Sequence, residues 1–300
     1  MDQIKNKYIV LIINGGHGKV IMSTALISAI KKQYPDRRII VVTSWDAPLY
    51  GHPDVWRFFT FNQIQNYFYD DYIDGKDVLI FQHDPYHEKS YLLREKHLNE
   101  TWCDLFNIKY NGEMPQLNLN AREIEIARDK LKPDIGKPIM MIQTHGGLPN
   151  NQYSKKSWAR DLPIDIAQKV VDYYSKSYRI LHIRLEEQPQ LKNVEPLTLP
   201  HRELYAAMTF SKKRLFIDSF AQHAAAALNL PSTVCWITND PKVFGYEMHD
   251  NIRPSANKIP SLTKYSFLEK YDITGQIQQF DFDTINLFNV EEIIESIKKQ

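Results

Sequence analysis

Four groups of polar residues, each directly after an apolar run, have the types and spacing to carry chemistry in this 300-residue chain. They are Gly15–Lys19, His83–Asp84, Thr144–Lys156 and Asp218–His223. In the last group, Asp218 and Ser219 precede an alanine-rich segment that is typical of a helix. A strand-to-helix junction presents unpaired N–H groups and the positive end of the helix dipole to an anion. The segment therefore predicts a phosphate or diphosphate site touched by Gln222 and His223, although Asp and Ser are also common N-caps.

The elements that must position these groups follow an alternating pattern of apolar strands and amphipathic helices. The first half predicts strands over Tyr8–Ile13, Arg38–Thr43 and Val78–Gln82 and a helix over Val20–Tyr34. After a proline-flanked segment over 131–138, the second half predicts strands over Ile139–Gln143, Arg179–Ile183, Arg214–Ile217 and Ser232–Ile237 and helices over Ile164–Tyr174, Arg202–Met208 and Val290–Lys299. The aromatic-rich segment Tyr50–Asp74 has no clear assignment. We therefore expect an α/β protein with two Rossmann-like domains, at residues 1–132 and 138–300, whose parallel sheets bind ligands beyond the carboxyl ends of their strands. The final helix is expected to pack back across the domains.

Composition narrows the class of protein. Apolar residues make up 43% of the chain, and no apolar run reaches the length of a membrane span. The N-terminus has no pattern of a secretory signal, and Cys103 and Cys235 are expected to be reduced core residues, which together predict a cytoplasmic protein. A net charge of +1 gives no general field for nucleic acid.

Three further patterns resemble nucleotide-binding or metal-binding motifs, but the sequence does not support those functions. The turn Gly15–Lys19 is similar to a Walker A loop, but Ile13 stands where its first glycine belongs and Val20 replaces the magnesium-binding Ser or Thr. Pro85 prevents a regular helix from presenting His83 and His87 to a metal. The segment Asp281–Asp283 is interpreted as a polar turn. The sequence therefore predicts neither a P-loop nor a metal site.

The order of these motifs resembles glycosyltransferase family 9, the group of ADP-heptose:lipopolysaccharide heptosyltransferases. The likeness rests on the N-terminal glycine-rich turn, Thr144-His145, Lys156 with Trp158, Asp218-Ser219 with the following His223-x-x-Ala-Ala-Leu, and Asn239-Asp240-Pro241. The chain departs from the family's pattern where Phe220 replaces a glycine. The resemblance implies a GT-B fold, in which the two parallel sheets face each other across a cleft, and an inverting transfer without metal or other cofactor.

Carried over position by position, the resemblance implies a nucleotide-sugar donor in the second half. Thr144 and His145 would lie near the donor phosphates, and Lys156 would pair with the diphosphate as a point charge. The phosphate and sugar would be held by Asp218, Ser219, Gln222 and His223. Arg184, at the end of a predicted strand, could contact the nucleotide, an inference from position alone.

The most important departure from the family lies in the N-terminal turn. Family members have Gly-Asp there, with the aspartate as the proposed general base, whereas this chain has Gly18-Lys19. A protonated lysine cannot accept a proton. Three alternatives follow: His17 or Asp84, beside His83, is the base; Lys19 binds an anionic acceptor or the departing diphosphate; or the chain has lost transfer activity.

The sequence thus predicts a glycosyltransferase that moves a sugar from a nucleotide-diphosphate donor to an acceptor hydroxyl. The first domain, with Gly16, Gly18 and His83 in its loops, would hold the acceptor, by default a surface glycan or lipopolysaccharide. Transfer to a modified nucleic-acid base or to a protein is an alternative, for which a basic groove is available. Its residues would be Lys155, Lys156, Arg160, Lys212, Lys213 and Arg214. A non-catalytic protein that binds a nucleotide or glycan is the other alternative.

Overall fold

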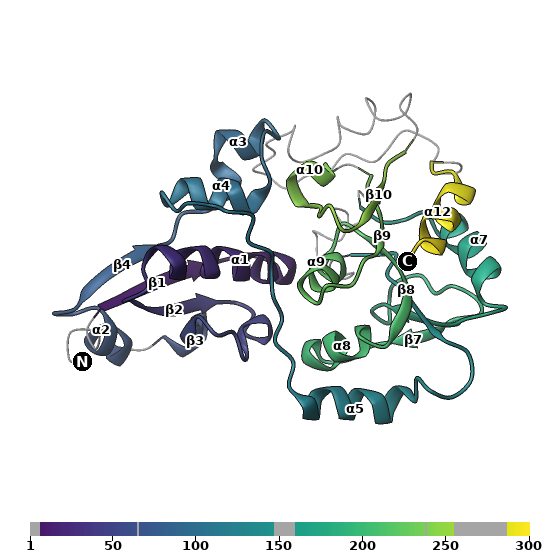
Figure 1. Ribbon diagram of the computed structural model, residues 1–300, viewed down its shortest axis with the longest axis horizontal. Helices are drawn as coiled ribbons and strands as arrows, with labels where there is room; N and C mark the ends of the chain where they lie inside the picture. The colour runs from purple at the N-terminus through teal and green to yellow at the C-terminus, as the bar shows by residue number, and fades with distance from the viewer. Residues whose placement is uncertain (1–6, 65, 147–159, 238, 255–286) are drawn as a thin grey trace. The chain divides into compact units, whose positions relative to one another are not determined.

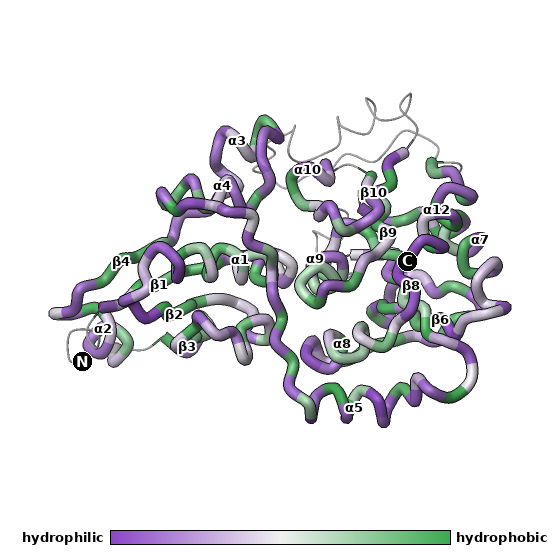
Figure 2. The backbone as a smooth tube through the Cα atoms, viewed as in Figure 1, coloured by the Kyte–Doolittle hydropathy of each residue, from purple (hydrophilic) through white to green (hydrophobic). Residues whose placement is uncertain are grey.

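The chain divides into two compact units, residues 1–120 and 121–300, in the computed structural model, which describes residues 7–64, 66–146, 160–237, 239–254 and 287–300 (Figure 1). Each unit has its own parallel sheet. The division precedes the predicted linker because helix α5 (Ala121–Leu131) packs on α8 (His201–Met208) of the second unit. The pair Arg202–Glu123, with 2.6 Å between Nη2 and Oε2, joins the two helices. The tube alternates between polar and apolar colours along α5, as expected for a helix with one face on a neighbour (Figure 2).

The first unit is a four-stranded sheet between helices. Its elements are β1 (Lys7–Ile13), α1 (His17–Gln33), β2 (Arg38–Thr43), η2 (Ala47–Leu49), β3 (Val55–Thr60), η3 (Phe61–Gln63), α2 (Asn66–Tyr72), β4 (Asp77–Phe81), η4 (Pro85–His87), α3 (Lys89–Leu92) and α4 (Leu98–Leu105). The strands run parallel in the order β3-β2-β1-β4. The strands expected at Tyr8, Arg38 and Val78 are confirmed, and the unassigned aromatic segment forms β3, η3 and α2.

Alternation along β1 and β2 divides the apolar residues between the two faces of this sheet. Ile9, Leu11 and Ile39 pack against α1 and against Trp102 of α4, whereas Val10 and Ile40 pack with the aromatic residues of α2. Helix α1 is buried over most of its length, from His17 to Ile30. The sheet edge at the carboxyl ends of its strands is thereby held in a fixed geometry.

The second unit is built on a six-stranded sheet. Besides α5 and α8 it contains β5 (Ile139–Ile142), α7 (Ile164–Tyr174), β6 (Arg179–Ile183), β7 (Glu195–Leu197), β8 (Ser211–Ile217), α9 (Phe220–Ala227), β9 (Thr233–Cys235), α10 (Pro241–Phe244), β10 (Asp250–Ile252) and α12 (Val290–Lys298). The strands are parallel in the order β10-β9-β8-β5-β6-β7. The chain order reverses between β5 and β8, which is the kind of position where open α/β sheets bind ligands.

Helices α7 and α12 bury their apolar sides in one core with β5, β6 and β8. Ile293 and Ile297 of α12 belong to this core, so the apolar face that was expected to pack back across the domains is used within the second unit. Alanine-rich α9 packs on β8, because small side chains allow a helix to approach a sheet closely. Cys103 and Cys235 are buried free thiols, as predicted. Among the described residues, no helix has the length and apolar character needed to span a membrane.

Candidate functional site

The carboxyl edge of the first sheet contains a buried ion pair. Lys19, in the first turn of α1, donates from Nζ to Oδ2 of Asp84 at 2.6 Å, and its side chain is 4% exposed against 32% for Asp84. The ammonium also lies 4.4 Å from the ring centre of Tyr86 and 5.4 Å from that of Trp102. Burial lowers the pKa of Lys19, and the hydrogen bond and charge of Asp84 oppose that shift.

The negative charge of Asp84 offsets the unfavourable position of the Lys19 ammonium at the positive, N-terminal end of the α1 dipole. A lysine in the first turn of a helix is placed unfavourably, and no acidic residue occupies the first turn of α1. Asp84 supplies the negative charge from the loop after β4, where its Oδ1 also accepts a hydrogen bond from the backbone N–H of Tyr86. Lys19 and Asp84, which the sequence offered as alternatives, are therefore partners, and the charge of Lys19 is already matched within the unit.

Gly15 makes room for the lysine. Its φ of +133° lies in the region that disfavours residues with a Cβ, and a Cβ placed there would be 2.9 Å from Cδ of Lys19. Gly16 has an extended backbone with φ of −75°, and a Cβ added to it would meet nothing within 4 Å. Gly18 lies inside the first turn of α1. Of Gly15 and Gly16, Gly15 is the one whose lack of a side chain leaves room for Lys19.

His17 and His83 lie at the same edge as the ion pair but in different environments. His17 is buried, and its ring stacks on that of Trp45, which follows β2, with 5.1 Å between ring centres and 27° between planes. His83 is exposed in the loop after β4. The edge therefore carries both candidates for a general base, His17 at the start of α1 and Asp84 in the loop after β4, with His83 next to Asp84 along the chain.

At the carboxyl edge of the second sheet, Asp218 and Ser219 connect β8 to α9. The Ser219 side chain makes no capping hydrogen bond and donates instead to Oε1 of Gln143, at the end of β5. Asp218 is buried and accepts a hydrogen bond from Nδ2 of Asn239, in the loop after β9. Burial raises the pKa of Asp218, against the opposing effect of Arg160 and Asn239. The simple reading of these residues as side-chain caps therefore does not describe α9.

The guanidinium group of Arg160 and the backbone of Gly146 lie at this junction. Nη1 of Arg160 donates to the carbonyl oxygen of Asp218 at 3.3 Å. A Cβ on Gly146 would lie 3.7 Å from Nη2 of Arg160 and 3.8 Å from Cβ of Ser219, while the N–H of Gly146 donates to Oδ1 of Asp161 at 3.0 Å. A helix N-terminus without a side-chain cap, beside a guanidinium group and a glycine, is suited to bind an anion.

Thr144 links two imidazoles next to this junction, that of half-buried His145 and that of buried His182. Its hydroxyl lies 2.8 Å from Nδ1 of His145 and 2.9 Å from Nε2 of His182, at the end of β6. Burial lowers the pKa of each histidine to about 4, and the nearby charge of Arg184 adds to the shift. Both rings are therefore neutral at physiological pH, and this cluster offers hydrogen-bonding groups without charge.

Gln222 and His223 face the interior instead of standing open on the first turn of α9. Nε2 of Gln222 donates to the carbonyl oxygen of Phe244 at 3.0 Å, and Nδ1 of His223 lies 2.9 Å from the hydroxyl of Tyr246. Both side chains are buried. In this geometry they hold the segment around α10 against α9.

The remaining predicted residues are placed as follows. Arg184 directs Nε and Nη2 to backbone carbonyls of Glu186 and Gln188 in its own loop. Lys155, Lys156, Trp158 and Asp281–Asp283 lie outside the described residues. Of the basic residues considered for a nucleic-acid groove, Lys212, Lys213 and Arg214 lie in the first half of β8, far along the strand from its carboxyl end, whereas Arg160 lies at that end. Within the described residues, no group of three or more potential metal ligands gathers.

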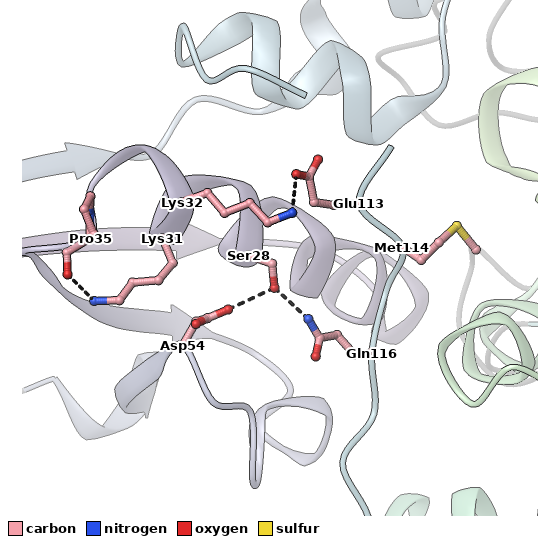
Figure 3. A pocket seen from close by; sticks show the side chains of 8 residues that line it. All are labelled: Ser28, Lys31, Lys32, Pro35, Asp54, Glu113, Met114 and Gln116. Carbon is pink, nitrogen blue, oxygen red and sulfur yellow. Dashed lines mark hydrogen bonds and ion pairs between the residues drawn. The ribbon is translucent and has the colours of Figure 1, made fainter. Parts of the chain in front are cut away.

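A cavity of about 440 Å³ in the first unit lies away from these groups, along the second half of α1 (Figure 3). Ser28 donates to Asp54 at 3.1 Å and accepts from Gln116 at 2.7 Å, and Lys32 pairs with Glu113 at 2.9 Å. Its polar groups are thus matched with one another, and none of the predicted site residues lines it.

Sequence reasoning missed several residues that the fold brings to the two edges. They are Trp45, Tyr86, Trp102, Gln143, Asp161, His182 and Tyr246, and Arg160 was considered only for a basic groove. For His182 the available signal was its place at the carboxyl end of a predicted strand. For Arg160 and Asp161, the available signal in the sequence was their position just before the predicted helix that begins at Ile164.

Comparison with protein-family models and with curated protein sequences gives no match. Solved structures match over nearly the whole chain. A glycosyl transferase family 9 protein from Veillonella parvula superimposes with a TM-score of 0.71 and 13% identity, over 98% of this chain and 97% of that one. The ADP-heptose lipopolysaccharide heptosyltransferase II of E. coli gives 0.65 and 14%, over 98% and 99%.

A third similar structure contains a nucleotide sugar. The dodecameric iron-containing heptosyltransferase TibC, from enterotoxigenic E. coli, was solved with ADP-D-β-D-heptose and gives a TM-score of 0.64 and 14% identity, over 98% of this chain and 76% of that chain. At these identities the likeness establishes the fold. The predicted resemblance is thus confirmed in structure: this chain has the fold of glycosyltransferase family 9 proteins and of the ADP-heptose heptosyltransferases.

Proposed function

We propose that this protein is a glycosyltransferase of the GT-B type, which transfers a sugar from a nucleoside diphosphate to an acceptor hydroxyl with inversion. The proposal is supported by this fold, shared with glycosyltransferases over 98% of the chain, together with the junction between β8 and α9, where a helix N-terminus without a side-chain cap lies beside Arg160. Fold alone does not decide function, so the chemistry of the site has to agree with it.

The second unit would hold the donor. The first-turn N–H groups of α9 and the guanidinium of Arg160 would bind the diphosphate and stabilise the charge that develops on it as the sugar departs. Lys156 is the second proposed cation, from the sequence resemblance. Thr144 and the neutral His145 would donate or accept hydrogen bonds beside the phosphates. ADP-heptose is the first donor to test, because TibC was solved with it.

The first unit would hold the acceptor and the base. We assign the base to Asp84, because its contact with the ammonium of Lys19, 2.6 Å from Oδ2, fixes a carboxyl group at the carboxyl edge of the first sheet. The side chain of Asp84 is one-third exposed, so an acceptor hydroxyl could reach it. His17 is the alternative base, and its stacking on Trp45 fixes the orientation of the ring.

The transfer is proposed to need no metal. The family resemblance is the basis for that statement, and TibC, described as iron-containing, shows why it must be tested. Transfer measured before and after dialysis against a chelator decides it.

The donor site is tested by the thermal shift of the full chain with ADP, UDP, GDP and their sugars, since a ligand of the native state raises the melting temperature. We expect one nucleotide series to give a shift that Arg160→Ala and Lys156→Ala reduce. Arg128→Ala, at an exposed arginine of the same unit that pairs with Asp134, is the control and should leave the shift unchanged. A folded protein that binds no nucleotide contradicts the proposal.

A non-catalytic binding protein is the second candidate function. The observation that favours it is that Asp84 already binds Lys19 through Oδ2 and the Tyr86 N–H through Oδ1. The two functions are separated by the release of nucleoside diphosphate from a bound nucleotide sugar. Release that is lost in Asp84→Asn and retained in Asp46→Asn identifies an enzyme.

A further inference from the structure

We propose that His182 is a positioning residue for the donor, which acts through the hydroxyl of Thr144 on the ring of His145. In this arrangement the hydrogen of the His145 ring stays on Nε2, the nitrogen that would donate to an oxygen of the donor diphosphate. The role rests on the proposed function and adds to it a buried residue of β6.

Strand register brings the three side chains together. β5 and β6 are parallel neighbours, and His182 lies opposite Ile142 in their register. Thr144 comes two residues after Ile142, so its side chain points to the same face of the sheet as that of His182. The hydroxyl of Thr144 lies 2.9 Å from Nε2 of His182 and 2.8 Å from Nδ1 of His145. Because Thr144 and His182 are fully buried and His145 is half-buried, a ligand of this cluster would contact His145.

The single hydrogen of a hydroxyl group limits how these bonds are arranged. A threonine hydroxyl donates once, and a neutral imidazole has one N–H group and one bare nitrogen. The described residues give the Thr144 hydroxyl no partner besides the two rings. In one arrangement Nε2–H of His182 donates to Thr144, and Thr144 donates to Nδ1 of His145. The opposite arrangement places the hydrogen of both rings on Nδ1. If both rings donated, the buried hydrogen of Thr144 would lack an acceptor.

The surroundings of His182 favour the first arrangement. Its Nδ1 is buried and has no hydrogen-bond partner within the described residues. In the opposite arrangement this nitrogen would carry a hydrogen without an acceptor, whereas in the first arrangement it is a bare nitrogen. Among backbone groups, a buried N–H without an acceptor is rarer than an acceptor without a donor, and we apply the same order to the imidazole ring. The hydrogen of His182 is therefore assigned to Nε2, and Thr144 donates to His145.

The chemistry of a diphosphate agrees with this direction. Its charged oxygens accept hydrogen bonds, so His145 binds one of them when the ring hydrogen is on Nε2. Thr144 already occupies Nδ1 of His145, and Nε2 makes no hydrogen bond in the part of the chain that the structure describes. His145 directly precedes Gly146, which lies beside Arg160 and Ser219 at the junction of β8 and α9. One uncharged donor would thus stand next to the guanidinium charge.

The first test is NMR of the full chain with isotope-labelled histidine at pH 7.5, without nucleotide and with ADP, UDP or GDP. Correlations between ring protons and ring nitrogens show which nitrogen carries the hydrogen. His145→Gln and His182→Gln, each of which removes one set of signals, assign the two rings. We expect the hydrogen on Nε2 of both rings, and a shift of the Nε2 signal of His145 when the nucleotide binds.

Nucleotide affinity is the second test. His182→Leu removes the donor to Thr144 and frees its hydroxyl to rotate, so we expect the affinity to fall between about twofold and tenfold. His182→Gln supplies an amide N–H for Thr144 and should retain most of the affinity. His52→Leu is the matched control and should leave the affinity unchanged. His52 is a buried histidine of the first unit, with its Nε2 3.3 Å from the carbonyl oxygen of Thr24.

A hydrogen on Nδ1 of either ring overturns the inference, and this measurement uses the unsubstituted protein, so it does not depend on whether a variant folds. An unmoved His145 signal in the presence of bound nucleotide overturns it as well, as do equal affinities of His182→Leu and His182→Gln. In each of these cases nucleotide still binds and the proposed function stands. A folded protein that binds no nucleotide removes the function itself.

Discussion

The Lys19–Asp84 pair predicts an unequal response to removal of its two members. Asp84→Asn leaves an ammonium in a side chain that is 4% exposed, with aromatic rings of Tyr86 and Trp102 around it. Breaking a buried pair in this way destabilises by about 3–5 kcal/mol. Lys19→Met leaves a carboxylate that is 32% exposed and hydrated, so we expect a loss of about 1 kcal/mol.

The double variant completes the cycle. Replacing both partners removes the buried charge together with its partner, so the destabilisation of the double variant should fall below the sum of the two single variants by about 1–3 kcal/mol.

The stability of Asp84→Asn should also depend on pH, with a definite sign. Without Asp84, the groups that raise the pKa of Lys19 are gone and burial lowers it further. The unfolded state then binds more protons than the folded state, so Asp84→Asn should regain stability as pH rises from 7 towards 10.

Urea denaturation of the four proteins at pH 7 and pH 9 measures these differences. A change in the midpoint urea concentration, with no change in the slope of unfolding free energy against urea, shows that stability alone has changed. Equal losses for the two single variants, or losses that simply add in the double variant, would refute the reasoning from burial.

Three further predictions use other parts of the molecule. The pKa of His145, His182 and His249 is lowered to about 4 by burial, so each contributes stability that is present above pH 6.5 and lost as pH falls towards 4, about 2 kcal/mol per histidine at pH 5. Urea unfolding at pH 7.5 and pH 5 measures that loss, which should be smaller in His249→Gln. Gly15→Ala should destabilise by about 1–3 kcal/mol through backbone strain and contact with Lys19, with Gly16→Ala as the tolerated control in the same thermal melts. Dialysis against a chelator should leave transfer activity unchanged, and a loss restored by iron would contradict metal independence.

The sequence predicted the buried strands well because their apolar runs are nearly continuous. Arg38–Thr43 and Arg179–Ile183 have the predicted bounds, as does the helix Ile164–Tyr174. By contrast, β3 contains Trp56 and Arg57, whose side chains are only partly covered on an edge strand. Such a strand has neither a continuous apolar run nor a clean alternation, so no period identified it.

The candidate site was predictable as a set of loops but not as a set of contacts. The carboxyl ends of parallel strands predicted which segments would gather, and Asp218, Thr144, Lys19 and Asp84 all lie there. Which of them would pair depends on the order of strands in the sheet. That β4 lies beside β1 brings Asp84 to Lys19 across 65 residues, and no local pattern encodes that neighbour.

Residues 289–300 complete the second core, and this has a consequence for folding during synthesis. The Gln300 side chain bonds to the backbone of Arg214 and to the hydroxyl of Thr233, and Ser296 bonds to Thr233 at 2.6 Å. The first compact unit ends at residue 120, whereas the second includes the final helix, which is completed up to 180 residues later. At ordinary rates of translation this is a delay of about 10–40 s. During it, a folded first unit is attached to a nascent second sheet whose apolar face still lacks α12, and chaperones that recognise exposed apolar strands would act in that interval.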